Sequence, residues 1–133
     1  MLYVSVHGDP TNFYPGVAGF ADERGAGKGE GFNLNLPMAH GASEADFLGQ
    51  LDVALAAVKG FGAEVLVLSL GFDIFELDPQ SKVAVTREGF ARLGERIRSL
   101  GVPCLIVQEG GYHLESLEDN ARAFFVNAEV WQL

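Results

Sequence analysis

The strongest constraint on the fold is a short apolar run, residues 64–70, which reads Glu-Val-Leu-Val-Leu-Ser-Leu and lies between glycines. Continuous, β-branched apolar runs of this length are typical of strands buried on both faces, as in parallel sheets. Residues 102–107 form a second such run. Between the two, apolar residues recur at helical spacing after the N-cap candidate Thr86 and before Gly101. A helix between two buried strands predicts a βαβ crossover and therefore a mainly parallel sheet.

The other segments fit the same class. Residues 8–31 are rich in Gly, Asp and Pro without periodicity, and they predict a long loop of the kind that is functional or mobile. Ser43, with Asp46 three residues later, predicts the capping box of a helix that ends at Gly60. Further elements are expected as a buried strand at 1–7, a half-buried strand at 32–36 ending at Pro37, and a helix at 115–130. We predict an α/β fold in one domain, residues 1–133, with helices on both faces of the sheet in three layers.

Composition limits the partners and the compartment. Apolar residues make up 48% of the chain, and no apolar run approaches the roughly 18 residues of a membrane span. The net charge of −9 argues against a nucleic-acid partner; it is compatible with a cationic substrate or simply with solubility. Cys104, the single cysteine, cannot form an internal disulfide and lies in an apolar run. It predicts a buried, inert thiol and a cytoplasmic setting.

Polar groups follow three of the predicted strands, where ligands bind in open parallel sheets. His7 and Asp9 follow the first strand, Asp73 follows residues 64–70, and Glu109 and Tyr112, with His113, follow residues 102–107. Each has an ordinary structural alternative: Asp73 as a turn residue, Tyr112 as a packing aromatic and His7 as a core histidine. No nucleophile elbow and no phosphate-loop spacing is present, so serine hydrolysis and nucleotide binding are disfavoured.

In combination these segments resemble, in the correct order, the histone deacetylase and acetylpolyamine amidohydrolase family. The matching segments are Val4-Ser5-Val6-His7, Phe13-Tyr14-Pro15-Gly16, residues 25–36, Ser69-Leu70-Gly71-Phe72-Asp73 with Asp78-Pro79, and Glu109-Gly110-Gly111-Tyr112. The Glu-Gly-Gly-Tyr form is more similar to polyamine amidohydrolases and class II deacetylases than to enzymes with an all-glycine form. Nearly all 133 residues are covered.

The resemblance implies a zinc-dependent hydrolase of acetyl-lysine or acetylpolyamine amides. Asp73 would be a zinc ligand, and Tyr112 the catalytic donor to the oxyanion. Tyr14 and Gly111 would line the substrate tunnel. Ser5 and Val6 match a secondary, monovalent-cation site in relatives.

Two family motifs are missing: the Asp-x-His that supplies the other zinc ligands, and the His-His pair that transfers protons. Both lie upstream of the segment that this chain resembles. We therefore expect a truncated, C-terminal part of the domain, which alone binds zinc poorly and is inactive. Its cut sheet predicts a homodimer, a complementary N-terminal half or a longer parent chain as the remedy. The alternative function is a non-catalytic oligomerisation or small-ligand-binding module.

Overall fold

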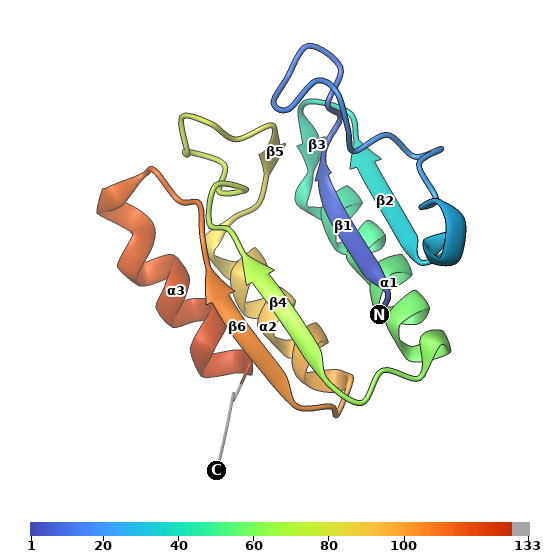
Figure 1. Ribbon diagram of the computed structural model, residues 1–133. Coiled ribbons are helices and arrows are strands. Elements are labelled where there is room, and N and C mark those ends of the chain that lie inside the picture. Colours follow the sequence, from blue (N-terminus) through green and yellow to red (C-terminus); the bar gives the residue numbers. More distant parts are fainter. Residues whose placement is uncertain (129–133) are drawn as a thin grey trace.

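A computed structural model describes residues 1–128, and it contains the βαβ unit that the sequence predicts (Figure 1). β4 (Leu66–Leu70) pairs in parallel with β6 (Cys104–Gln108). The connecting helix, α2 (Arg87–Ser99), begins after Thr86, whose side chain caps it as predicted. All pairings between the described strands are parallel, which confirms the α/β class with strands flanked by helices.

A second parallel pair consists of β1 (Tyr3–Gly8) and β2 (Asn33–Met38). The loop between them contains one 3-10 turn, η1 (Gly27–Gly29). The prediction that the second strand ends at Pro37 is wrong, because Pro37 lies opposite His7 within the pairing. β2 pairs on one side only, and a strand at a sheet edge tolerates a residue that cannot donate a hydrogen bond.

The helix α1 (Glu44–Phe61) begins with the predicted capping box. The Ser43 side chain accepts a hydrogen bond from the Asp46 amide, and the Asp46 carboxylate accepts one from the Ser43 amide. The predicted end of the helix at Gly60 is wrong. The helix continues to Phe61, and Gly62 caps it in the left-handed conformation (φ 72°) that glycine adopts without strain.

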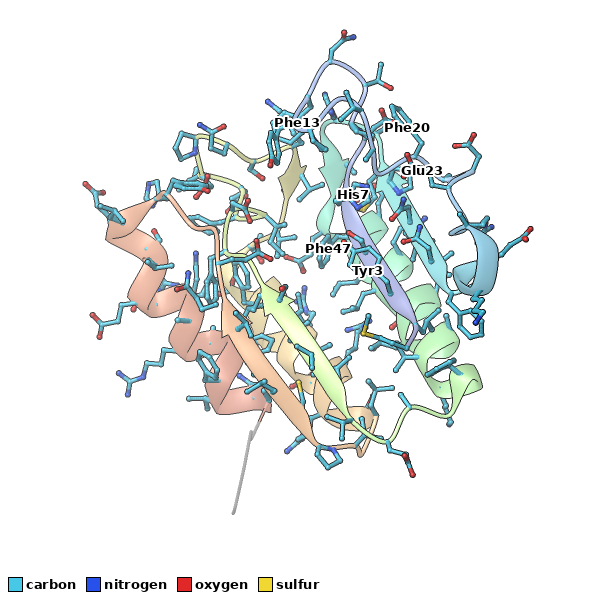
Figure 2. The ribbon with its side chains drawn as sticks, in the orientation of Figure 1. Tyr3, His7, Phe13, Phe20, Glu23 and Phe47 are labelled. Carbon is cyan, nitrogen blue, oxygen red and sulfur yellow. The ribbon has the colours of Figure 1, made fainter. Side chains whose placement is uncertain are left out.

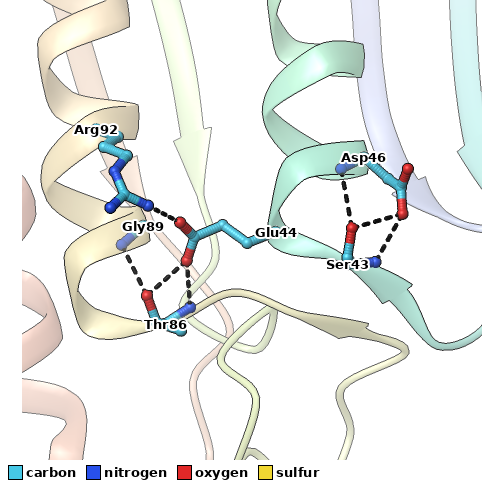
Figure 3. A network of polar contacts seen from close by, with 6 residues as sticks. All are labelled: Ser43, Glu44, Asp46, Thr86, Gly89 and Arg92. Carbon is cyan, nitrogen blue, oxygen red and sulfur yellow. Dashed lines mark hydrogen bonds and ion pairs between the residues drawn. The ribbon is translucent and has the colours of Figure 1, made fainter.

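Two short strands that the sequence does not predict, β3 (Ala42–Ser43) and β5 (Val83–Ala84), pair in parallel. Beside them, Glu44 at the start of α1 reaches the start of α2 (Figure 3). Its carboxylate accepts hydrogen bonds from the Thr86 amide at 3.0 Å and the Thr86 hydroxyl at 2.5 Å, and it pairs with Arg92. These contacts connect the β1–β2 unit with the β4–β6 unit.

The last described helix, α3 (Leu114–Ala128), packs along α2. Gly94 allows the close approach, since a methyl group there would collide with the main chain of Phe124. Phe90 and Phe124 are fully buried in the core. The prediction of a helix at 115–130 is therefore confirmed up to residue 128, and residues 129 and 130 lie outside the described part. Among helices of the described residues, none is both long and apolar enough to cross a membrane.

Helices cover one face of the strands, and apolar side chains remain exposed on the other. Val67 of β4 is 63% exposed and Leu105 of β6 is 60% exposed, and the strand register places them opposite each other. Val65 and Val107 are exposed as well. The prediction that both strands are buried on both faces is wrong for this chain. Only the other face, with Leu70 at its end, faces the core.

Strand edges are also unpaired among the described residues, including one edge each of β1 and β4. β1 pairs only with β2, and β4 only with β6, among the described residues. In Figure 1 they are the inner strands of the two pairs, and they point in the same direction. The exposed face and these edges fit a truncated α/β domain, in which the described helices form one of the two predicted helical layers.

The long loop after β1 is fastened to the strands through His7 and Glu23 (Figure 2). His7 Nε2 lies 2.8 Å from the Gly19 carbonyl oxygen, so Nε2 carries the proton of this hydrogen bond, and the Ser5 hydroxyl lies 2.7 Å from Nδ1. The Glu23 carboxylate accepts from the Gly19 amide at 2.7 Å and from the buried Asn35 side chain at 3.0 Å. His7 therefore has a structural role, as the alternative reading of a core histidine predicted, because its ring is hydrogen-bonded to the main chain of the loop.

Candidate active site

The candidate site lies at the carboxyl ends of β4 and β6, which are adjacent because Leu70 pairs with Gln108. Two main-chain hydrogen bonds continue the contact beyond the strands. The Glu109 amide donates to the Leu70 carbonyl at 3.0 Å, and the Phe72 amide donates to the Gly110 carbonyl at 2.8 Å. The loop that carries Asp73 and the loop that carries Tyr112 are thereby held side by side.

Two glycines make room for the Asp73 carboxylate. A β-carbon on Gly110 would lie 2.7 Å from Asp73 Cγ and 2.8 Å from Oδ2, and one on Gly71 would collide with Oδ1. A side chain at either position would displace the carboxylate. Gly71 and Gly110 come from the two different strand ends, so the pairing of β4 with β6 forms this glycine cradle.

The surroundings of Asp73 oppose its negative charge. Burial raises the pKa of its carboxyl group above the ordinary value of 3.8, and the negative charges of Asp78 and Glu109 raise it further. A carboxylate that is half-buried beside other acids gains from a cation. Asp73 thus has the chemistry of one metal ligand.

One ligand does not make a metal site. Among residues 1–128, no group of three or more His, Cys, Asp or Glu side chains is placed to hold a metal ion. Catalytic zinc takes three protein ligands. The described residues therefore do not provide a complete set of zinc ligands, and the assignment of Asp73 as one ligand stays a prediction.

The Tyr112 side chain is 57% exposed, and the main chain of Tyr112 is hydrogen-bonded to Asp78. The buried Asp78 carboxylate accepts hydrogen bonds from the Tyr112 amide at 2.6 Å and the His113 amide at 3.0 Å. Sequence reasoning quoted Asp78 only as part of a motif and assigned it no role. The signal that could have identified it is the Asp-Pro pair close after a strand end, where a short acidic side chain often binds main-chain amides.

The remaining candidates lie on β1, on the loop after it, and beside Tyr112 in the loop after β6. Tyr14 is 85% exposed on the long loop. Gly111, at φ 133°, lies next to Tyr112 and packs on Phe72. The Ser5 hydroxyl is engaged by His7. A tunnel at Tyr14 and Gly111 and a cation site at Ser5 and Val6 stay predictions.

Asp9 and His40 are linked to each other rather than to Asp73. His40 Nε2 lies 2.8 Å from the Asp9 carbonyl oxygen, and the Asp9 carboxylate accepts a hydrogen bond from the Thr11 amide at 2.7 Å. The His113 ring packs edge-on against Phe75, with 5.7 Å between the ring centroids. These contacts assign turn and packing roles to Asp9, His40 and His113.

Comparison with known proteins gives this site a context. Residues 1–128 match the model of the histone deacetylase domain family. The chain is 65% identical over 125 residues to acetylpolyamine amidohydrolase of Burkholderia pseudomallei, covering 94% of this chain and 37% of the relative. It is 44% identical over 121 residues to acetylpolyamine amidohydrolase 1 of Pseudomonas aeruginosa, covering 91% of this chain and 35% of that protein.

Solved structures with similar folds point to the same family. The crystal structure of acetylpolyamine aminohydrolase from Burkholderia pseudomallei superposes with a TM-score of 0.94 at 64% identity, covering 96% of this chain and 37% of that one. The HDA15 HD domain superposes with a TM-score of 0.87 at 34% identity, covering 96% and 38%. This chain spans little more than a third of the length of these relatives.

Proposed function

Because the chain belongs to the histone deacetylase domain family and is a partial domain of it, we propose that it supplies the C-terminal part of a deacetylase active site. Asp73 would be one zinc ligand and Tyr112 the catalytic donor to the oxyanion. The observation that carries this proposal is the glycine cradle, which holds a half-buried, charge-opposed carboxylate beside the Tyr112 loop.

Zinc bound at Asp73 would polarise the substrate carbonyl and lower the pKa of a bound water. The cradle fits the role of a ligand because Gly71 and Gly110 leave the carboxylate oxygens uncovered by side chains of their own. The other zinc ligands would come from the rest of the domain, since one carboxylate holds zinc weakly at neutral pH. We infer that this chain alone binds zinc poorly and does not deacetylate.

Tyr112 supplies a hydroxyl donor at the edge of the same site. Its phenol would donate a hydrogen bond to the negative charge that develops on the amide oxygen. Tyr14 and Gly111 would line the tunnel that admits the acyl group. In the same proposal, residues 8–31 would be mobile or take part in subunit contacts, and Ser5 and Val6 would hold a secondary monovalent cation.

The substrate would be an acetylated amine, either acetyl-lysine or an acetylpolyamine. The names of the relatives support this class. A net charge of −9 favours the approach of a cationic chain over that of an anionic one. We propose a cytoplasmic location because the single cysteine, Cys104, is buried. Burial raises the pKa of its thiol and keeps the thiol unreactive.

A partner would complete the sheet. The exposed apolar face of β4 and β6 and the unpaired edges of β1 and β4 favour a complementary N-terminal half. A homodimer through the same surface is the second possibility. Neither requires nucleic acid or a membrane.

The test is reconstitution. The chain is mixed with the N-terminal two thirds of the Burkholderia pseudomallei relative, and zinc-dependent release of acetate from an acetylated polyamine is measured. We expect activity only in the mixture, and its loss in Asp73→Ala and Tyr112→Phe. Acetate release by the purified chain alone would contradict the predicted inactivity. A stable complex without activity would favour the non-catalytic module.

A further inference from the structure

Asp78 is the most deeply buried acid among the described residues, with 7% of its surface exposed. Its two oxygens serve different segments. Oδ1 accepts the Gln80 amide at 2.9 Å within its own turn, whereas Oδ2 accepts the Tyr112 and His113 amides at 2.6 and 3.0 Å from the loop after β6. One carboxylate thus joins the loop after β4 to the loop after β6.

The turn that carries Asp78 is itself fixed. The Asp78 amide donates to the Phe75 carbonyl at 2.9 Å, and the Ser81 amide donates to the Asp78 carbonyl at 3.0 Å. Phe75 is buried against Phe90 in the core. The carboxylate is therefore attached to a rigid turn, as a residue that positions another residue must be.

After Gly110, whose carbonyl accepts a hydrogen bond from the Phe72 amide, the Tyr112 loop is held mainly by Asp78. Gly110 and Gly111 precede the tyrosine, and glycines leave the main chain many conformations. The Tyr112 side chain is more than half exposed, so packing does not set its direction. The main chain is held before Gly111 by β6 and by the Phe72 amide, and after it by Asp78. Charge-assisted hydrogen bonds to two successive amides are strong enough to decide the conformation between those points.

We propose that Asp78 is the positioning residue for Tyr112, because it holds the Tyr112 and His113 amides and thereby aims the phenol at the Asp73 side of the site. This inference rests on the proposed function in assigning Tyr112 a catalytic role. If Asp78 stabilised only its own turn, replacing it would destabilise the fold but would not change the conformation of the Tyr112 main chain.

The first arm of the test needs no activity. Amide hydrogen exchange is measured by NMR on the full chain with Asp78→Ala and Asp78→Asn, and with Asp46→Asn, which changes a carboxylate that caps α1, as the control. We expect Asp78→Ala to accelerate exchange at Tyr112 and His113 by about tenfold or more, with Ile106 of β6 unchanged. Asp78→Asn, which keeps an oxygen acceptor, should have a smaller effect, and Asp46→Asn none at these amides.

The second arm uses the reconstituted complex. Asp78→Ala should lower kcat by about tenfold or more with KM within about threefold, and Asp78→Asn should restore most of the rate. In a Tyr112→Phe background, Asp78→Ala should cost no further rate, because it acts through the missing hydroxyl. Equal losses in both backgrounds, or unchanged exchange at Tyr112 and His113, would overturn the proposal. If Tyr112→Phe alone leaves the rate intact, the catalytic role of Tyr112 fails while the exchange arm still decides what Asp78 holds.

Discussion

At the scale of single residues, Asp73 carries a charge that its surroundings oppose. Its folded-state pKa lies above the ordinary 3.8 because of burial and of the charges on Asp78 and Glu109. The ionised form is therefore disfavoured in the folded chain: no penalty exists below the ordinary pKa, and the full penalty is present above the raised one. At neutral pH the ionised carboxylate therefore lowers the stability of the folded chain. A metal ion bound to it would offset this loss.

Asp73→Asn is accordingly expected to stabilise the metal-free chain at pH 7, by no more than about 1 kcal/mol because the half-exposed group is screened by water. Urea denaturation at pH 7 and at lower pH measures this gain. The gain should shrink as the pH falls towards 3.8 and vanish below it, where the wild-type carboxyl is protonated in both states. A constant difference across this range would show that the charge is not the cause.

Gly110→Ala tests the glycine cradle. The added methyl group would overlap the Asp73 carboxylate, and we expect a loss of about 1 kcal/mol in the free energy of unfolding. Removing that carboxylate with Asp73→Ala in the same chain should recover most of the loss. Gly49→Ala is the matched control, because a β-carbon there meets nothing within 4 Å in α1. It should be neutral or stabilising by up to about 1 kcal/mol.

Asp73 and Tyr112 became candidates in the sequence because residues at the carboxyl ends of parallel strands converge, and the family resemblance supplied their predicted roles. Sequence reasoning could not reach the role of Asp78. That role depends on which main-chain amides point at the carboxylate, and these belong to a loop 34 residues away in the sequence. The pattern of side chains in a sequence does not predict the direction of a main-chain amide. His7 shows the converse. A histidine at a strand end met the criterion for a site residue, yet its ring is used by Ser5 and Gly19.

At the scale of elements, Glu44 joins the two halves of the chain. Burial raises the pKa of its carboxyl group, but the hydrogen bonds from Thr86 and the charge of Arg92 outweigh burial and lower the pKa below 4.5. A lowered pKa contributes stability above the ordinary pKa that is lost as the pH falls through the folded-state value. Gly89 is required here, because a β-carbon would collide with the Glu44 carboxylate and lie 2.7 Å from Val85 Cγ1.

Glu44→Ala should therefore lower the free energy of unfolding by about 1–3 kcal/mol at pH 7, because it leaves the Thr86 amide and Arg92 without their partner. Chemical denaturation checks the value, with the exposed Glu95→Ala as the control. The Glu44→Gln variant should differ from wild type at pH 7 and converge with it in acid. Equal losses in Glu44→Ala and Glu95→Ala would contradict this role.

Apolar residues on one helical face predicted α1, α2 and α3, and continuous apolar runs predicted β4 and β6, because each element is long enough to show its pattern. These patterns missed β3 and β5, which are two residues each and too short to show one. Helix ends depended on the conformation of single glycines: Gly60 lies inside α1, whereas Gly62 has the positive φ that ends it. Composition cannot distinguish those two glycines.

At the scale of the whole molecule, the exposed apolar face of β4 and β6 is the surface through which we expect assembly. Val67→Lys with Leu105→Lys places two charges at opposite positions in the register of that face. We expect the double variant to keep its helical circular dichroism and to lose association, with itself or with the N-terminal half, in sedimentation velocity. Val126→Lys, on the exposed side of α3, is the control and should associate as wild type does.

The near-continuous apolar character of residues 64–70 predicted burial on both faces, and the described chain buries only one. The sequence thus encodes contacts of the whole domain, whereas the structure shows those that this chain can make by itself. The prediction of a truncated domain agrees with the share of its relatives that the chain spans.

The parallel pairings also bear on how such a chain acquires its shape. β1 meets β2 across one loop, and β4 meets β6 across one helix, so each pairing needs only the segment between its own two strands. Loop closure over short separations is fast compared with the search for distant partners. The two units can therefore form in order as the polypeptide leaves the ribosome, with the Glu44 contacts made once α2 has emerged. Pulse-labelled exchange should find β4 and β6 protected together, and independently of any second polypeptide.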